Sequence, residues 1–312
     1  MALSVAVVGA GAWGLALAAA AARSSGSALL YSRKPSGATP EGVTVVGDLA
    51  EVGKRARIVV LAVPSGVARD VARQLGDHVD GRHFVVHGIR GLSGANLDPI
   101  SEVVRQETPA RRVGALGGPA LAPDLLAGRP SVLVCGSDFP EVNAAVAESF
   151  SSRATRVYTT HDLRGLEWAS ALVGCLAIGI GCAQEAGVSP GLIAAVISRG
   201  VEEAARIAAA AGGEERTLLG LAGYGDLLAS IAQQDRPEVR LGRALGRGKP
   251  LAEAAAEAHL RVEAVELIPR LVEWTKHNGV EAPILAALSR TVLAGRPVAE
   301  IIDQLMTNPM RR

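Results

Sequence analysis

Three glycines near the start of the chain have a spacing that could bind phosphate. Gly9, Gly11 and Gly14 form the pattern G-x-G-x-x-G, with Trp13 directly before the third glycine. They follow an apolar run, Leu3–Val8, and precede an alanine-rich segment of helical character. In such a turn the first glycine allows the bend, the second leaves room for a pyrophosphate, and the third lets the helix approach the sheet. The pattern predicts a dinucleotide-binding turn, although three glycines that merely begin an alanine-rich helix are the alternative.

The segment after the second expected strand indicates which dinucleotide this turn takes. Proteins that select NAD place an Asp or Glu about 20 residues beyond the glycines, where it binds the ribose 2′-hydroxyl. Here the segment is Tyr31-Ser32-Arg33-Lys34, which holds no acidic residue. Because a hydroxyl and two cations suit a 2′-phosphate, we expect NADP in preference to NAD. A solvated basic loop without a ligand is the alternative.

Two polar residues near the end of a later strand could act on a substrate. His87 ends the apolar run Phe84–His87, and Arg90 follows three positions later. Ligands of α/β proteins bind at the carboxyl ends of strands, and histidine titrates near neutral pH. His87 is therefore a candidate proton donor, with a surface or turn histidine as the alternative. The six histidines lack metal-site spacing, so we expect no metal.

The elements that must position these residues divide the chain into two halves. Up to about Thr160, β-branched runs alternate with helical patterns, which indicates βαβ units and a doubly wound sheet. From His161 onward the sequence is rich in Ala, Leu, Glu and Arg with helical spacing. We expect an α/β protein with an N-terminal Rossmann domain at 1–161 and an all-helical domain at 162–312. The expected strands are Leu3–Val8, Ala28–Tyr31, Val43–Val46, Ile58–Val63, Phe84–His87, Val113–Leu116 and Val132–Cys135.

Composition excludes several classes of protein. Of 312 residues, 49% are hydrophobic and 3% aromatic, and the 32 Lys and Arg nearly balance the 31 Asp and Glu. A net charge of +1 predicts no bulk attraction to nucleic acid or anionic lipid. The apolar start, Met1–Ala22, lacks a basic region and is broken by glycines, so we expect neither a signal peptide nor a membrane span. Cys135, Cys175 and Cys182 have no C-x-x-C spacing, which favours buried thiols in a soluble cytoplasmic protein.

Six segments, taken together and in this order, resemble the bacterial type of NAD(P)-dependent glycerol-3-phosphate dehydrogenase. They are GAGAWG at 9–14, AVPS at 62–65, RGL at 90–92, GGPALAPDLLAGRPS at 117–131, GLAGYGDL at 220–227 and GVEAPI at 279–284. The resemblance covers nearly the whole chain. It implies a Rossmann domain followed by a helical domain, a homodimer, and a place in glycerophospholipid metabolism. The implied reaction is hydride transfer between a nicotinamide and the couple of dihydroxyacetone phosphate and glycerol 3-phosphate.

The resemblance also assigns roles to individual residues. Asp226 matches the family's catalytic aspartate, Ser230 a hydroxyl residue, and Glu263 a glutamate near the cofactor. An ungapped alignment places Pro237-Glu238 at a family Arg-Asn pair that contacts phosphate and cofactor, whereas a shift of one residue places Arg236 there. The implied cofactor contacts further include Pro64. The implied substrate contacts are Gly118, Pro119, Ala120, Ser230 and Arg236.

Two lysine positions of the family hold other residues in this chain. The first position is Arg90, and the second is Val173, followed by Gly174 where the family has asparagine. Arginine can hold a phosphate or polarise a carbonyl, but it is too weak an acid to protonate an alkoxide, and valine can do neither. Two interpretations follow. The chain is an NADP-dependent oxidoreductase acting on a CH–OH group, or it is a catalytically weak or inactive NADP(H)-binding pseudoenzyme that serves as a sensor or scaffold.

Overall fold

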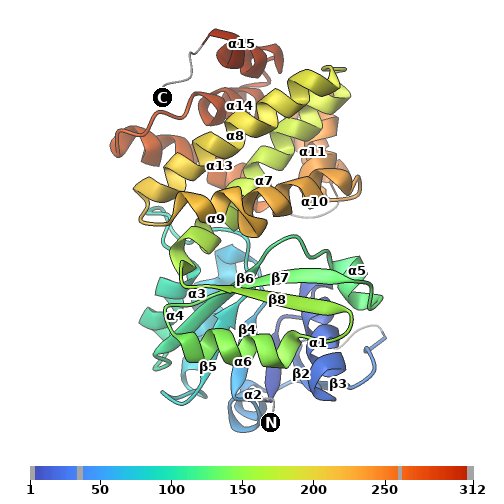
Figure 1. Cartoon of the computed structure of the whole chain (residues 1–312), viewed down its shortest axis with the longest axis vertical. Helices are drawn as coiled ribbons and strands as arrows, with labels where there is room; N and C mark the ends of the chain where they lie inside the picture. Colours follow the sequence, from blue (N-terminus) through green and yellow to red (C-terminus); the bar gives the residue numbers. More distant parts are fainter. Residues whose placement is uncertain (1–3, 34–37, 259–261, 308–312) are drawn as a thin grey trace. The chain divides into compact units, whose positions relative to one another are not determined.

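The computed structural model describes residues 4–33, 38–258 and 262–307, which form two compact units (Figure 1). Unit 1 comprises Met1–Gly94 and Asp98–Glu167, and unit 2 comprises Ala95–Leu97 and Trp168–Arg312. The structure divides inside helix α7 (Leu163–Glu185), a few residues beyond the expected boundary between residues 161 and 162. The expected domain limits themselves stay a prediction.

Unit 1 is built on one eight-stranded sheet with the order β3-β2-β1-β4-β5-β6-β7-β8. Every neighbouring pair is parallel except β6 and β7, which are antiparallel. The strand order reverses between β1 and β4, and α/β proteins bind ligands at such a switch point. The strands are β1 (Val5–Val8), β2 (Ala28–Tyr31), β3 (Val43–Val46), β4 (Ile58–Leu61), β5 (Phe84–His87), β6 (Arg112–Gly117), β7 (Ser131–Gly136) and β8 (Thr155–Thr160).

The expected doubly wound fold is confirmed, and strand β8 is an addition to it. All seven expected strands are present within a residue or two of their expected limits. In β8, Thr155 and Val157 are buried while Arg156 and Tyr158 are exposed. Because β8 lies at the edge of the sheet, it lacks the continuous apolar run that marks a strand buried on both faces. Because polar and apolar residues alternate in β8, the sequence does not predict this strand.

Helices cover both faces of this sheet, as alternate residues of β1 show. Val5 and Val7 belong to one apolar cluster, whereas Ala6 and Val8 belong to another. The first cluster is completed by α1 (Ala12–Ser25), α5 (Ala122–Leu126) and α6 (Pro140–Phe150). The second is completed by α2 (Leu49–Arg55), α3 (Ser65–Gly76) and α4 (Ile100–Glu107). Both faces of the strands are consequently removed from water.

The described residues of unit 2 form only helices and their connections, as the sequence predicted. Within the described residues, α7 is the one helix that is long and apolar enough to cross a membrane, and 94% of its most apolar stretch is buried inside the structure. Besides α7, the helices are α8 (Pro190–Ala210), α9 (Glu215–Leu219), the π-helical turn η1 (Leu221–Gly225), α10 (Asp226–Ala232), α11 (Pro237–Gly246), α12 (Leu251–Glu257), α13 (Glu263–His277), α14 (Pro283–Ala294) and α15 (Ala299–Thr307).

Glycines let α7 and α11 pack backbone against backbone. A Cβ at Gly242 of α11 would lie 2.1 Å from the carbonyl oxygen of Ile178 on α7. A Cβ at Gly181 of α7 would lie 2.7 Å from the carbonyl oxygen of Val239 on α11. Neither distance accommodates a carbon atom, so both positions need glycine for this close approach. The packing holds the start of α11 beside the middle of α7.

The three cysteines are buried and unpaired, which confirms the expectation of buried thiols. Burial raises the pKa of the Cys182 thiol to about 11 and that of Cys135 to about 12. Thiols with such high pKa values are inert as nucleophiles near neutral pH.

Candidate functional site

The glycine turn follows β1 at the switch point of the sheet, and two of its glycines are required by close packing. Gly9 has a φ of +121°, and a Cβ there would lie 2.3 Å from the carbonyl oxygen of Ala62, just after β4. A Cβ at Gly14 would lie 1.8 Å from the carbonyl oxygen of Gly9. Any larger side chain at either position would push backbone atoms apart. These two glycines therefore shape the turn itself.

The remaining glycine, Gly11, which is the second of the turn, faces open space instead. A Cβ at Gly11 meets no other described atom within 4 Å. Gly11 is the N-cap of α1, and the first bond of the helix runs from the Leu15 N–H to the Gly11 carbonyl oxygen. The N–H groups of the first turn thus lie outside the helical ladder and beside free space, where an anion binds most favourably. The turn fits a dinucleotide pyrophosphate.

Two further residues that are predicted to contact the cofactor, Trp13 and Pro64, lie at the same edge of the sheet. The indole Nε1 of Trp13 lies 2.7 Å from where a Cβ of Gly88 would be, so the ring lies against the residue that follows β5. Pro64 is exposed and is the N-cap of α3, three residues after β4 ends. Because β4 lies directly beside β1, Pro64 is placed close to the glycine turn.

The basic segment expected to select the cofactor follows β2 at this edge. The Gly9 N–H donates to the Tyr31 carbonyl oxygen at 3.2 Å, which places the end of β2 beside the turn. The Ser32 N–H donates to the Val46 carbonyl oxygen at 3.1 Å, and the Arg33 side chain is exposed. Lys34 lies outside the described residues. The end of β2 thus places Ser32 and Arg33 beside the glycine turn.

The structure holds His87 in a buried network, so the interpretation of a surface or turn histidine is wrong. His87 is 1% exposed, and its Nε2 lies 2.9 Å from Oε1 of Glu167, which is 2% exposed. Its Nδ1 lies 3.4 Å from the backbone nitrogen of Ile89. Glu167 also accepts from the backbone N–H and the hydroxyl of Ser101, at 2.8 and 2.7 Å. With both ring nitrogens engaged inside unit 1, this geometry supports a positioning role and gives no support to His87 as a proton donor.

The predicted substrate contacts of unit 1 occupy different environments. Arg90 is half-buried in the loop after β5. Gly118 is buried with a φ of +93°, and Ala120, 3% exposed, packs into the apolar core of unit 1. Pro119 is half-buried and lines a cavity. Of these three consecutive residues, Pro119 lines this cavity of unit 1.

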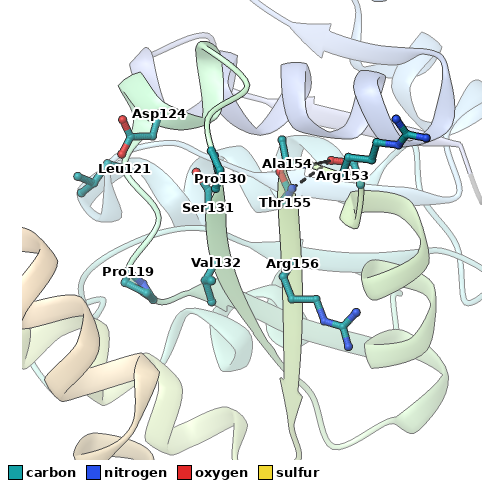
Figure 2. A pocket seen from close by; sticks show the side chains of 11 residues that line it. Pro119, Leu121, Asp124, Pro130, Ser131, Val132, Arg153, Ala154, Thr155 and Arg156 are labelled. Atoms are coloured by element: carbon teal, nitrogen blue, oxygen red, sulfur yellow. Dashed lines mark hydrogen bonds between the residues drawn. The ribbon is translucent and has the colours of Figure 1, made fainter.

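This cavity has a volume of about 540 Å³ and lies across the starts of β7 and β8 (Figure 2). Since β7 runs antiparallel to β6, these strand starts lie at the same sheet edge as the ends of the parallel strands. The lining residues are Pro119, Leu121, Asp124, Pro130, Ser131, Val132, Ser152, Arg153, Ala154, Thr155 and Arg156. Neither Arg90 nor any residue of the glycine turn is among them, so the cavity is separate from the candidate cofactor site.

In unit 2, a π-helical turn places Asp226 at the start of α10. The Gly225 N–H donates to the Gly220 carbonyl oxygen at 3.0 Å, the long spacing of a π-helix. A Cβ at Gly223 would lie 2.1 Å from the Leu218 carbonyl oxygen, so the turn needs glycine there. Asp226 follows directly and is completely buried. The glycines of GLAGYGDL thus serve to position one carboxylate.

Asp226 lies beside two other predicted residues, Ser230 and Arg236, and Arg236 also contacts Glu238. The Ser230 hydroxyl donates to the Asp226 carbonyl oxygen at 2.5 Å and lies 3.3 Å from its Oδ1. Arg236, 6% exposed, has its Nη1 at 3.7 Å from Oδ1 of Asp226. Its Nε donates to Oε2 of Glu238 at 2.9 Å. The structure therefore brings Asp226, Ser230 and Arg236 together, with Glu238 as an additional partner.

Val173 and Gly174, where the resemblance implies lysine and asparagine, lie close to this group. Val173 is 1% exposed and packs in an apolar cluster with Leu227 and Val239. A Cβ at Gly174 would lie 3.8 Å from Oε1 of Glu238 and 3.7 Å from Cβ of Ala264, both ordinary contact distances. Glu263, the residue before Ala264, is the first residue of α13 and is half-buried.

Three buried or partly buried glutamates make contacts that the sequence did not predict. Glu167 was detectable as a rare charge in the nearly uncharged stretch Leu163–Glu185. Glu203 on α8 accepts from the backbone N–H groups of Ile284 and Leu285 at 3.0 and 2.7 Å, at the start of α14. Burial raises the pKa of Glu203 to about 7. No spacing in the sequence marks Glu203, because its partners lie on another helix, α14. The third glutamate, Glu238, accepts from Arg236, two residues before it.

Comparisons with known proteins cover both units. Residues 34–143 match the N-terminal model, and residues 162–303 the C-terminal model, of NAD-dependent glycerol-3-phosphate dehydrogenase. A glycerol-3-phosphate dehydrogenase (NAD(P)+) of Leuconostoc mesenteroides is 30% identical over 98% of this chain and 98% of its own. That of Rhizobium johnstonii is 32% identical over 99% of both chains.

Solved structures show the same fold. The crystal structure of glycerol-3-phosphate dehydrogenase from Coxiella burnetii has a TM-score of 0.90 at 24% identity, covering 98% of this chain and 99% of that chain. The enzyme of Saccharomyces cerevisiae has a TM-score of 0.86 at 19% identity, covering 98% of this chain and 99% of its own. With both family models matched and relatives aligned from end to end, the chain belongs to the glycerol-3-phosphate dehydrogenase family.

Proposed function

We propose that this chain is an NADP(H)-dependent oxidoreductase of the couple of dihydroxyacetone phosphate and glycerol 3-phosphate, with slow turnover. The observation that carries the proposal is the contrast among the three glycines of the turn. At Gly9 and Gly14 the position of a Cβ is already occupied by neighbouring backbone atoms. At Gly11 that position is free space beside the start of α1. The acid-free segment at Ser32 and Arg33 supports NADP over NAD.

The residues of the chain supply binding and electrostatics. The N–H groups after Gly11 hold the pyrophosphate, and Arg33 pairs with the 2′-phosphate. NADPH supplies the hydride that reduces the carbonyl when it is bound. Arg90 provides a fixed positive charge that stabilises an oxyanion or holds a phosphate. In unit 2, Asp226 holds Arg236 in place, at 3.7 Å between Oδ1 and Nη1.

The low rate follows from what surrounds Val173. Its side chain belongs to an apolar cluster, so no acid is held at that position. An arginine guanidinium is too weak an acid to serve as the proton donor, and a carboxylate near a developing oxyanion would repel it. Loss of a positioned general acid costs a factor of about 10² to 10⁴ in rate. We therefore expect turnover far below the typical value of about 10 per second.

A second candidate is an NADP(H)-binding protein that turns over no substrate at all. The apolar packing of Val173 and the internal pairing of Arg236 favour it, because both remove groups that could act on a ligand. Such a protein would serve as a sensor or scaffold. The homodimer, the cytoplasmic location and the place in glycerophospholipid metabolism are proposals common to both candidates.

Two measurements on the purified protein separate the candidates. Quenching of tryptophan fluorescence reports NADPH binding, and the nicotinamide absorbance reports turnover of dihydroxyacetone phosphate. We expect NADPH to bind and the absorbance to fall slowly. NADPH binding with an absorbance that stays constant at high protein concentration favours the second candidate. Failure to bind either NADPH or NADH contradicts both.

A further inference from the structure

A buried carboxylate, that of Glu167, holds two separate segments of unit 1. Its Oε1 lies 2.9 Å from Nε2 of His87, the last residue of β5, and accepts from the backbone N–H of Ser101 at 2.8 Å. Its Oε2 accepts from the Ser101 hydroxyl at 2.7 Å. All three residues are at most 2% exposed, so water does not compete for these bonds. Glu167 therefore ties the end of β5 to the start of α4.

The bonds of His87 fix which ring nitrogen carries the proton. The backbone N–H of Ile89, a residue that is 4% exposed, donates to Nδ1 of His87 at 3.4 Å. Because a backbone N–H can only donate, Nδ1 is an acceptor and holds no proton. The ring proton is then on Nε2, which donates to Glu167. The carboxylate thus orients the imidazole, and the imidazole in turn holds the backbone of Ile89.

The backbone held in this way begins the loop after β5, which packs on the helix of the glycine turn. The N–H of Gly88 donates to the carbonyl oxygen of Leu61, at the end of β4, at 2.8 Å. A Cβ at Gly88 would lie 2.7 Å from Nε1 of Trp13 and 3.2 Å from Cδ1 of Leu17, so the loop lies directly on the first two turns of α1. Gly88 and Ile89 therefore have little freedom while the imidazole keeps its orientation.

The place of this loop in the sheet indicates which part of a dinucleotide it borders. In a doubly wound sheet the pyrophosphate lies at the turn after the first strand, and the adenosine ribose lies at the end of the second. Strands β4 and β5 lie on the other side of β1, in the order β2-β1-β4-β5. The nicotinamide half would consequently extend over the ends of β4 and β5, where Gly88 and Ile89 follow.

We propose that Glu167 and His87 are positioning residues for the nicotinamide half of the cofactor site. Glu167 orients the imidazole of His87, and His87, itself buried, fixes the loop at Gly88 and Ile89. This role deepens the proposed function and rests on it, because it concerns the same NADPH site. The adenosine half, bound at the glycine turn and at Arg33, does not depend on the network.

The test compares two ligands by calorimetric titration of the parent and of Glu167→Ala. NADPH has both halves, whereas 2′,5′-ADP has the adenosine half with its 2′-phosphate and no nicotinamide. We expect Glu167→Ala to bind NADPH about tenfold more weakly, the cost of one lost hydrogen bond, and to bind 2′,5′-ADP as the parent does. A general loss of stability cannot produce this difference, since it would affect both ligands or neither.

Two further variants separate positioning from stability. Glu167→Gln keeps an oxygen that can accept from the Nε2–H of His87 and gains an amide group that can donate to the Ser101 hydroxyl, so its NADPH affinity should stay close to that of the parent. Glu203→Ala is the matched control, because Glu203 is likewise buried and accepts from two backbone N–H groups, at the start of α14 in unit 2. It should unfold at a lower urea concentration and bind NADPH like the parent.

A folded Glu167→Ala variant that binds NADPH as tightly as the parent would overturn the proposal, and so would equal weakening of NADPH and 2′,5′-ADP. If Glu167→Ala does not fold, His87→Leu serves in its place, because it removes the acceptor of the Ile89 N–H directly. A parent that binds neither ligand contradicts the proposed function, and the positioning role falls with it. A parent that binds both, with no difference among the variants, contradicts the positioning role alone.

Discussion

The glycine turn of unit 1 and the Asp226 group of unit 2 differ in the surroundings of their polar atoms. Around Gly11, N–H groups of the first helical turn face free space and are available to a ligand. Around Asp226, the charged side chains bind one another, with Arg236 held by both Asp226 and Glu238. Binding of a nucleotide depends on backbone geometry, which only a few glycines must preserve. Catalysis depends on the identity of single side chains, and this chain has Arg90 and Val173 at the two positions where the resemblance implies lysine.

The largest effect is expected for a change at Gly11, if backbone geometry forms the cofactor site. Gly11→Val should abolish NADPH binding, by more than about hundredfold, because a branched side chain fills the space of the pyrophosphate. The protein should stay folded, since a Cβ at Gly11 meets no other described atom within 4 Å. Fluorescence titration and circular dichroism measure the two properties.

Gly14→Val is the matched comparison within the same turn. Its Cβ would lie 1.8 Å from the Gly9 carbonyl oxygen, so this variant should lose the fold of unit 1 together with binding. A folded Gly11→Val protein that binds NADPH like the parent would show that the turn is not the site.

The second prediction concerns the pH dependence of stability in unit 2. Glu203 has its pKa raised from 4.5 to about 7 in the folded state, chiefly by burial. Between these values the folded state holds a proton that the unfolded state has released, so the free energy of unfolding should fall as pH rises from 4.5 to 7. The loss should be about 3 kcal/mol and should level off at higher pH.

Urea unfolding at several pH values measures this slope. In Glu203→Gln the contribution of this residue should vanish, so the difference in unfolding free energy between the parent and the variant should itself depend on pH. A constant difference from pH 5 to pH 8 would contradict the assignment.

The third prediction asks whether His87 supports the structure of unit 1. His87→Asn removes a buried contact to Glu167, which is 2% exposed. Leaving a buried polar group short of a hydrogen-bond partner should lower the free energy of unfolding by about 2 kcal/mol. The pH profile of any turnover should keep its shape. A profile that loses a step near neutral pH, with stability unchanged, would restore His87 as a proton donor.

The smallest expected effect lies in the side chains that choose between cofactors. Arg33→Ala should weaken NADPH binding about tenfold, because it removes one charge-assisted contact of about 1.5 kcal/mol. NADH binding should change little, since NADH has no 2′-phosphate. Arg55→Ala, which removes an exposed arginine paired with Glu51 elsewhere in unit 1, is the control. Equal affinities of the parent for NADPH and NADH would contradict NADP selection.

Much of the fold follows from local patterns in the sequence. Central strands such as Ile58–Leu61 are apolar on both faces, and Gly9, Gly11 and Gly14 mark the turn after the first of them. These signals are short-range, because the strand period and the needs of a tight turn are satisfied within a few residues. The edge strand β8 was missed because it is buried on one face only, so its apolar pattern is diluted.

The pairing of charged side chains was decided by the tertiary structure. The sequence by itself determined the two-part fold, predicted a dinucleotide turn, and placed Arg90 and Val173 where the resemblance implies lysine. It did not determine that Glu167 would bind His87 across 80 residues, or that Glu203 would cap α14 across more than 80. Such contacts depend on which helices pack together. For example, Gly181 of α7 and Gly242 of α11 each lie against the backbone of the other helix, which allows a close approach. A charge has no periodicity of its own, so its partner becomes visible only when the chain is folded.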